Sequence, residues 1–388
     1  MKNDGVTVVI RDGTVEVVAS DGVIVSVGGV AASESVSNAA VLDASGCHVL
    51  AGFIDLQMNG AVGVDLTSEP HRVAEVAEFL ASCGVTSFQP TVISSDEAQT
   101  RHAIDVLGQW REHGNAGSGQ ARSLGVHLEG PFLEQSRRGA HPPQHLRPPS
   151  IAEVTSWVTA GAVSMVTLAP ESPGAIDVIR TLVAAGVVVS AGHTAMTADA
   201  LNEAAEAGLS GATHLFNAMG TMSARSPGPA GAVLDHGSLI AGLIADGVHV
   251  GAAMVRLAWR VLGPDRIALV TDAMAATGLG DGHYVVGDTD VVVSGAAART
   301  RDGVLAGGVM PSDAAVRNLI AITGCTLAEA SRAASSTPAR WLGRGDVGRL
   351  AVGLRADVVL LDEQLAVVAT VIDGQVAYDP QRRLHGRS

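Results

Sequence analysis

The sequence of 388 residues is poor in aromatic residues, lysine and cysteine. Aromatic residues make up only 3% of the chain, so a core has to be built from Val, Ala, Leu and Ile. The three cysteines, Cys47, Cys83 and Cys325, show no paired spacing, which argues against a disulfide framework and against a zinc ribbon. Lys2 is the only lysine, so an active site that needs a lysine in the middle of the chain is excluded.

A basic leader and long apolar runs are missing as well. The N-terminus has no basic region followed by a long apolar segment, and no apolar run approaches membrane-spanning length. The net charge of -14 opposes binding to nucleic acid or to an anionic membrane, so an anionic substrate has to be held by local arginines. We therefore expect a soluble cytoplasmic protein that acts on a small molecule, without a nucleic-acid or membrane partner.

The two ends of the chain share a β-rich texture. Short β-patterned segments separated by glycine fill residues 1–49, and the same texture returns near the C-terminus. Asp-Gly pairs, such as Asp12-Gly13 and Asp373-Gly374, stand between these segments as turn signals. The pattern predicts a small β-sandwich domain built from residues 1–49 and 346–388.

Residues 50–345 alternate between apolar strand-like runs and segments with helical spacing. The eight runs are continuously apolar, as expected for parallel strands that are buried on both faces. They lie at Ala51–Met58, Thr86–Val92, Leu124–Leu128, Ser164–Leu168, Val187–Ala191, Ala212–Phe216, Leu239–Ala245 and Ile267–Thr271. The pattern predicts a (β/α)8 TIM barrel. A doubly wound open sheet is the alternative, but no glycine-rich dinucleotide turn follows the first strand.

Two segments depart from this alternation. Residues 217–238 are rich in Gly, Pro, Ser and Ala, which favours a long functional loop over a helix. Residues 283–305 have the pattern of a β-hairpin inserted after the eighth strand.

Chemistry-bearing residues follow the predicted barrel strands, where active sites of such barrels lie. Glu129 ends the third strand, His193 follows the fifth and His214 follows the sixth. One carboxylate and two imidazoles can bind an ion such as Zn²⁺ and leave a position open for water. A single histidine at a strand end is usually a hydrogen-bonded structural residue, but three candidate ligands at three strand ends favour a metal site.

Asp272 follows the eighth strand. It could be a fourth ligand, a general base, or the N-cap of a helix that starts at Ala273. A further candidate is His141 in the polar loop after Glu129, although a histidine beside a proline in a loop can also have no role.

The chain resembles the N-acetylglucosamine-6-phosphate deacetylases of the amidohydrolase superfamily over essentially its full length. The motifs that carry the resemblance, in chain order, are Gly52–Gly60, His127–Phe132, Ala191–Thr194, Thr213–Met219, Ala245–His249 and Val270–Ala273. The resemblance implies an amidohydrolase-type barrel and release of acetate from N-acetylglucosamine 6-phosphate in amino-sugar metabolism. Rival interpretations are a deacetylase of another N-acetylhexosamine 6-phosphate, such as the galactosamine epimer, and a catalytically inactive relative that binds sugar phosphates.

The same resemblance assigns roles to individual residues. Glu129, His193 and His214 would hold the metal, Asp272 would be the catalytic acid and base, and His141 would polarise the acetamide carbonyl. The positions that resemble substrate-binding residues are Ala140, Asn217, Ala218, Arg225, His249, Leu305, Ala306 and Gly307. Arg225 resembles the phosphate-binding arginine of the family, whose phosphate contacts can cross a dimer interface, so a homodimer is implied. Without the resemblance, Arg225 would be read as a solvated surface arginine.

The first predicted strand carries Gln57 and Asn59 where most amidohydrolases have a His-x-His pair. Amide side chains are poor Zn²⁺ ligands beside imidazole, and the chain offers no lysine to bridge a second metal. We therefore expect one divalent ion per subunit, foremost Zn²⁺, although Fe²⁺, Co²⁺ and Mn²⁺ also suit a Glu-His-His site. The two amides would then only form hydrogen bonds.

Overall fold

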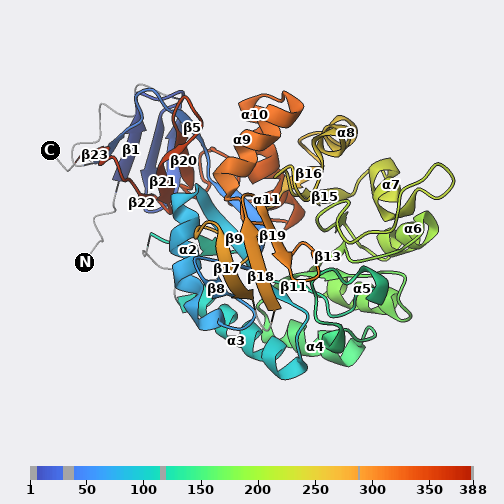
Figure 1. The fold of residues 1–388 in the computed structure, drawn as a ribbon. Coiled ribbons are helices and arrows are strands. Elements are labelled where there is room, and N and C mark those ends of the chain that lie inside the picture. Colours follow the sequence, from blue (N-terminus) through green and yellow to red (C-terminus); the bar gives the residue numbers. More distant parts are fainter. Residues whose placement is uncertain (1–6, 29–38, 114–118, 287–288, 386–388) are drawn as a thin grey trace.

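The computed structural model describes residues 7–28, 39–113, 119–286 and 289–385, so Lys2 lies outside the described residues. Strands from both ends of the chain form two sheets beside a barrel (Figure 1). The five-stranded sheet has the order β23-β4-β1-β2-β3 and the four-stranded sheet the order β22-β21-β20-β5. Their strands are β1 (Thr7–Arg11), β2 (Val17–Ser20), β3 (Val23–Val27), β4 (Ala40–Asp43), β5 (His48–Ala51), β20 (Val358–Leu361), β21 (Val367–Ile372), β22 (Gln375–Tyr378) and β23 (Leu384–His385).

The two sheets bury one shared aliphatic core. Val8 and Ile10 from the first sheet pack in the same cluster as Val358 and Leu360 from the second. Val, Ile and Leu suit this arrangement because β-branched and aliphatic side chains fill a pleated, half-buried surface. We propose that these sheets are the small domain expected from the two ends of the chain.

The middle of the chain forms the predicted (β/α)8 barrel. Its eight strands are β6 (Phe53–Met58), β9 (Val85–Ile93), β11 (Val126–Glu129), β12 (Val163–Leu168), β13 (Val188–Ala191), β14 (Gly211–Ala212), β15 (Ile240–Leu243) and β16 (Ile267–Leu269). Each neighbouring pair from β6 through β16 is parallel, and the strands are buried almost throughout. The short β10 (Arg122–Ser123) adds to the start of β9.

Helices surround the strands (Figure 1). They are α2 (Val73–Ser82), α3 (Glu97–His113), α4 (Ile151–Ala160), α5 (Ala175–Ala184), α6 (Ala198–Glu206), α7 (Gly228–Asp235), α8 (Ala252–Leu262), α9 (Ser312–Thr323), α10 (Leu327–Ser331) and α11 (Thr337–Trp341). On α5, Val178, Ile179 and Leu182 are buried at helical spacing, which directs one face towards the strands. The hydroxyls of Ser150 and Thr197 accept the N–H three residues on and so cap α4 and α6.

The remaining short elements lie in connections. They are β7 (Gly60–Ala61), β8 (Val64–Asp65), the 3-10 turns η1 (Pro70–Arg72), η2 (Gln135–Arg137) and η3 (Pro143–His145), and the π-helical turn η4 (Arg332–Ser336). In the described parts of the chain, no helix is long and apolar enough to cross a membrane.

The barrel has a weak seam between its first and last strands. Among the described strands, β6 and β16 share no ladder, and an isolated bridge joins Met58 to Ala273. The N–H groups of Asn59 and Gly60 both donate to the Ala273 carbonyl, at 2.9 and 3.1 Å. Other contacts must therefore help to hold this seam closed.

Three details differ from the sequence-based expectations. Residues 228–235 form helix α7, so the expected long loop is shorter and ends where Pro229 can start a helix. The inserted segment is a three-stranded meander, β17 (Gly282–Val286), β18 (Thr289–Ser294) and β19 (Ala297–Thr300), with residues 287–288 outside the described part. Strand β14 stops at Ala212 because the backbone then turns, with a positive φ of 31° at His214.

Candidate metal centre

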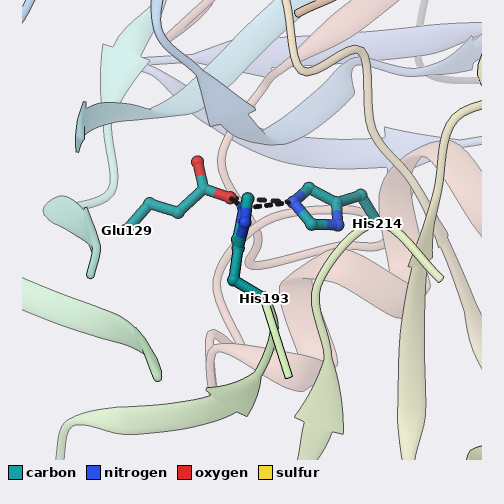
Figure 2. A group of neighbouring side chains, drawn as sticks. All are labelled: Glu129, His193 and His214. Atoms are coloured by element: carbon teal, nitrogen blue, oxygen red, sulfur yellow. Dashed lines mark hydrogen bonds and ion pairs between the residues drawn. The ribbon is translucent and has the colours of Figure 1, made fainter. Parts of the chain in front are cut away.

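Glu129, His193 and His214 converge at the carboxyl end of the barrel (Figure 2). Glu129 ends β11, whereas each histidine lies two residues beyond β13 or β14. The Nε2 atoms of His193 and His214 lie 3.1 and 2.9 Å from Glu129 Oε1 and 3.0 Å from each other. All three side chains are buried, so they are held rigidly around one point.

The electrostatics of this cluster favour a positive charge at its centre. Burial by itself opposes ionisation of Glu129, but the bonds and charges of the two histidines hold its pKa well below the ordinary value. Burial likewise disfavours a charged His214, and Glu129 outweighs it and raises the pKa of that ring. Two imidazole nitrogens and one carboxylate oxygen at such short separations are a donor set that suits a divalent ion.

The second nitrogens of the two rings test the fit to a metal. His193 Nδ1 lies 2.9 Å from the Arg137 carbonyl, which fixes the proton on Nδ1 and leaves Nε2 free to bind. His214 Nδ1 is buried and has no partner in the described residues. The cluster therefore fits one metal ion, with the His193 ring oriented by the protein more firmly than the His214 ring.

The backbone at the cluster adopts conformations that are rare for residues with side chains. His193, His214 and Asp272 have φ of 50°, 31° and 50°. Left-handed backbone at a non-glycine residue is disfavoured, and such residues gather at functional sites. The geometry aims three strand-end side chains inward at some cost in local stability.

Asp272 lies beside the cluster and is held by the two amides of the first strand. Gln57 Nε2 and Asn59 Nδ2 donate to Asp272 Oδ1 at 3.0 and 2.7 Å. Gln57 Nε2 also donates to Glu129 Oε1 at 3.1 Å. Burial, followed by the charge of Glu129, raises the pKa of Asp272 to about 6. The two amides thus act as hydrogen-bond donors to the carboxylates of Asp272 and Glu129.

His141 faces the same centre from the loop after β11. Its Nε2 lies 4.0 Å from Glu129 Oε2, and its ring packs against that of His193. The Ser94 N–H donates to His141 Nδ1 at 3.3 Å, and Ser94 Oγ lies 2.9 Å from the same atom. Burial lowers the pKa of His141 to about 3, so the ring is neutral. Because Nδ1 accepts a hydrogen bond from the Ser94 N–H, the neutral ring carries its proton on Nε2, which points into the site.

His249 is fixed by a carboxylate three residues earlier. His249 Nδ1 lies 2.6 Å from Asp246 Oδ2, and both side chains are buried. Asp246 Oδ1 accepts the N–H groups of Val248 and His249, each at 2.8 Å. These bonds keep the pKa of Asp246 low although burial opposes it. The Nδ1 side of the ring is therefore occupied, and Nε2 remains for a ligand.

Loop residues that are expected to contact the sugar lie beside the segments that carry His193 and His214. The Asn217 amide donates to the His214 carbonyl at 3.2 Å, and the Ala218 carbonyl accepts from Thr194 N at 3.2 Å. Ala140 follows Gly139, which has a φ of 57° and packs so closely that an added Cβ would lie 3.3 Å from His193 Cε1. These contacts place both loops against the segments that carry His193 and His214.

The stretch from Leu305 to Gly307 lies against the backbone of Asp272. An added Cβ at Gly307, which has a φ of 84°, would lie 2.9 Å from the Asp272 carbonyl, and Gly308 N donates to that carbonyl at 2.7 Å. The Ala306 N–H donates to Ala298 and so ties this stretch to β19. Arg225 forms no such contact: its side chain is exposed and has no hydrogen bond or ion pair to the residues described.

Sequence reasoning missed the residues that orient these groups. Ser94 follows β9 and Asp246 follows β15, so both stand at strand ends where the chemistry was sought. For Asp246 a signal was available, since a carboxylate three residues before a histidine in a turn can reach its ring. For Ser94, no local pattern announces a contact with a residue 47 positions away.

Comparisons with known proteins agree with this geometry. Residues 48–377 match the model of the Amidohydrolase family. The chain is 40% identical over 351 residues to N-acetylglucosamine-6-phosphate deacetylase of Bos taurus, covering 87% of this chain and 85% of the relative. It is 39% identical over 329 residues to N-acetylgalactosamine-6-phosphate deacetylase of Escherichia coli O157:H7, covering 84% and 86%.

The fold also matches that of a solved structure. It is a mutant N-acetyl-D-glucosamine-6-phosphate deacetylase from Mycobacterium smegmatis in complex with N-acetyl-D-glucosamine-6-phosphate. Its TM-score is 0.86 at 33% identity, and the match covers 96% of this chain and 98% of that one.

Proposed function

Since this chain belongs to the N-acetylglucosamine-6-phosphate deacetylase family of amidohydrolases, we propose that it hydrolyses the acetamide of N-acetylglucosamine 6-phosphate. The products are glucosamine 6-phosphate and acetate. The observation that carries the proposal is the buried Glu129–His193–His214 cluster, which lies beside an acidic group suited to proton transfer, Asp272.

Cleavage of the amide would need residues that hold a metal ion and a residue, Asp272, that moves a proton. Glu129, His193 and His214 would hold one divalent ion, which when bound activates water and polarises the substrate carbonyl. The Asp272 carboxylate takes up the proton of the attacking water and then delivers it to the departing nitrogen. Gln57 and Asn59 hold Asp272 Oδ1, so they fix the position from which this proton moves.

His141 completes the site as a donor to the carbonyl oxygen. Its neutral ring carries the proton on Nε2 because Ser94 donates to Nδ1. A donor aimed at the place where negative charge develops lowers the barrier without any rearrangement. The role assigned to His141 by resemblance is thus supported by the direction of its proton.

The sugar phosphate would be bound by residues around the mouth of the barrel. Asn217, the backbone of Ala218 and Ala140, and His249 are proposed to contact the sugar, with residues 305–307 lining the pocket. Arg225 is proposed to bind the phosphate, because its exposed guanidinium is unpaired in the described residues and can form two parallel hydrogen bonds to a phosphate. A homodimer in which Arg225 serves the partner's site would explain why its guanidinium is exposed and unpaired in the described residues. R225M tests phosphate binding and should raise KM for the 6-phosphate more than it lowers kcat.

The relatives differ in the sugar epimer for which they are named. Relatives named for the glucosamine and for the galactosamine 6-phosphates match this chain about equally well. Deacetylation of N-acetylgalactosamine 6-phosphate is therefore the second candidate function. Contacts to the sugar ring, rather than the metal cluster, have to decide between them.

One assay tests the reaction and the substrate together. Purified protein is incubated with N-acetylglucosamine, N-acetylgalactosamine and their 6-phosphates, acetate release is measured, and the metal content of the same sample is determined. We expect the highest kcat/KM with N-acetylglucosamine 6-phosphate and close to one divalent ion per chain. Absence of acetate from both 6-phosphates would refute the proposal, and a higher kcat/KM with the galactosamine epimer would favour the second candidate.

A substitution tests the assignment of Asp272. Asp272→Asn should keep the metal ligands in place but lower kcat by about 10²-fold or more, because proton transfer by a positioned side chain contributes about 10²–10⁴-fold. Normal turnover by D272N with metal bound would show that another group moves the proton.

A further inference from the structure

Asp55 is a buried carboxylate of β6 that has no part in the reaction described above. Its side chain is 2% exposed and accepts four hydrogen bonds from three parts of the chain. Thr271 donates through its hydroxyl at 2.5 Å and through its N–H at 3.3 Å. The Gln57 N–H donates at 3.2 Å and the Ser312 hydroxyl at 3.4 Å.

These bonds cross the weak seam of the barrel. Strands β6 and β16 share no ladder in the described structure, and the Thr271 N–H that follows β16 donates to the Asp55 side chain. A side-chain carboxylate thus substitutes for a strand partner next to the site. A buried carboxylate is expensive unless donors satisfy it, and here four donors do so.

Thr271 passes the effect of Asp55 on to its neighbour, Asp272. A hydroxyl has one proton, and the Thr271 proton goes to Asp55 Oδ2, so a lone pair of Oγ1 is left to accept the Ala273 N–H at 3.2 Å. Asp55 therefore holds the residues on both sides of Asp272, whose left-handed φ of 50° needs such support.

Gln57 connects Asp55 to the side-chain carboxylate of Asp272 by a second route. Asp55 Oδ1 accepts the Gln57 N–H, and the Gln57 amide donates to Asp272 Oδ1 and to Glu129 Oε1. Asp55 thus contacts Thr271, the backbone neighbour of Asp272, and also Gln57, whose amide binds the Asp272 side chain.

We propose that Asp55 is a positioning residue of the deacetylase, which sets the place of the Asp272 carboxylate through Thr271 and Gln57. The inference rests on the proton-transfer role proposed for Asp272. It predicts that loss of the Asp55 charge affects turnover more than substrate binding, because a misplacement of about 1 Å in a catalytic group can cost about 10²-fold.

Two substitutions break the connection at different points. Asp55→Asn keeps the shape but turns an acceptor towards Thr271 into a donor, and Thr271→Val removes the hydroxyl while leaving the other three donors to Asp55. Each should lower kcat about 10- to 100-fold with little change in KM and with the metal retained. Thr271→Ser, which restores the hydroxyl, should recover most of the turnover.

Ser312→Ala is the matched control. This substitution removes a donor to the same Asp55 oxygen, but Ser312 forms no hydrogen bond with residues 271–273 in the described structure, so kcat should stay close to that of the unchanged enzyme. The D55N/T271V double variant should be no slower than the slower single variant, because both substitutions break one connection. If D55N does not fold, the comparison of T271V with T271S decides.

A crystal structure of D55N separates this inference from the proposed function. We expect the Asp272 carboxylate to move away from the Gln57 and Asn59 amides. Turnover and Asp272 contacts that remain unchanged in folded, metal-bound D55N and T271V would overturn the inference. Should the unchanged protein release no acetate from either 6-phosphate, the function fails, while the position of Asp272 in D55N still decides whether Asp55 sets it.

Discussion

The two ends of the barrel handle buried charge in opposite ways. At the amino end, Arg122 bonds Asp357 at 2.9 Å and Asp373 at 2.6 Å, so it joins the start of the barrel to the sheets formed by the chain ends. At the carboxyl end, Glu129 and Asp272 lie close together among imidazoles and amides. No arginine in the described parts of the chain forms an ion pair with either of these two carboxylates.

The difference separates a structural site from a reactive one. The carboxylates at the amino end are balanced by arginines of the chain itself, so the cluster is complete as folded. At the carboxyl end, Glu129 and Asp272 have no arginine partner in the described residues, the pKa of Asp272 is raised to about 6, and the buried Nδ1 of His214 has no partner in the described residues. A bound cation has to balance the negative charge of these carboxylates. This agrees with the rule that the carboxyl end of such barrels carries the catalytic residues, whereas the amino end contributes to stability. Substitutions at the two ends should then separate activity from stability.

Glu129→Gln should have the largest effect on activity. It removes the one negative ligand of the cluster, so we expect loss of the metal from the folded protein. Metal ions supply several kcal/mol of transition-state stabilisation, so kcat/KM should fall by about 10³-fold or more. Metal analysis and circular dichroism on the same sample check this. Glu134→Gln, in the same loop, is the control and should keep both metal and activity, whereas a metal-loaded and active E129Q would contradict the ligand assignment.

Arg122→Met should have the largest effect on stability. It leaves Asp357, whose side chain is 3% exposed, without a counter-charge, and removing one partner of a buried pair costs about 3–5 kcal/mol of unfolding free energy. The folded enzyme should keep its kcat. Urea unfolding measures the loss, and R180M, which breaks the exposed pair with Asp177, should change the stability by no more than about 1 kcal/mol. Equal losses in R122M and R180M would argue against a structural role for Arg122.

His141→Leu should have a smaller effect, confined to turnover. Loss of one donor to the carbonyl oxygen costs about 10²–10³-fold in comparable sites, so kcat should fall by about that factor while the metal stays bound. Steady-state kinetics and metal analysis provide the test. His145→Leu, four residues on in the same loop, should leave kcat unchanged, and a H141L enzyme with normal kcat would refute the role of His141.

The sequence could predict residues that are placed by the end of a strand, but not the partners to which they bond. The barrel and the convergence of Glu129, His193 and His214 were predictable, because apolar runs mark the strands and the residues that follow them lie at the carboxyl end of the barrel. Asp272 was predictable as a strand-end residue but not as one that two amides hold, because this depends on the distance between β6 and the residue after β16 in the folded barrel.

Residues that act through long-range contacts could not be found in the same way. Arg122 has no local pattern that names Asp357, which lies 235 positions away, and Asp55 resembles any polar residue in a strand. Helix α7 was missed because Gly228 and Pro229 suggest a loop, although Pro is well suited to the first turn of a helix. Tertiary contacts outweigh local signals in each case.

Asp373→Asn should have the smallest effect and a defined pH dependence. Burial opposes ionisation of Asp373, but Arg122 and Arg355 outweigh it and lower its pKa below 3.8, so its contribution exists above about pH 4 and is lost as the pH falls through the folded-state pKa. Because the side chain is 34% exposed, water screens the pair, and D373N should lose about 1 kcal/mol at pH 7. Asn also tolerates the φ of 49° at this position. Urea unfolding at pH 7, 5 and 3.5 should show a difference from the unchanged protein that shrinks only at the lowest pH.

The pH dependence has the opposite sign at the carboxyl end of the barrel. There the pKa of Asp272 is raised to about 6, so its ionisation lowers the stability as the pH rises from 4 to 6. A D373N difference that grows in acid would therefore show that Asp373 behaves like Asp272, and it would break the contrast between the two ends.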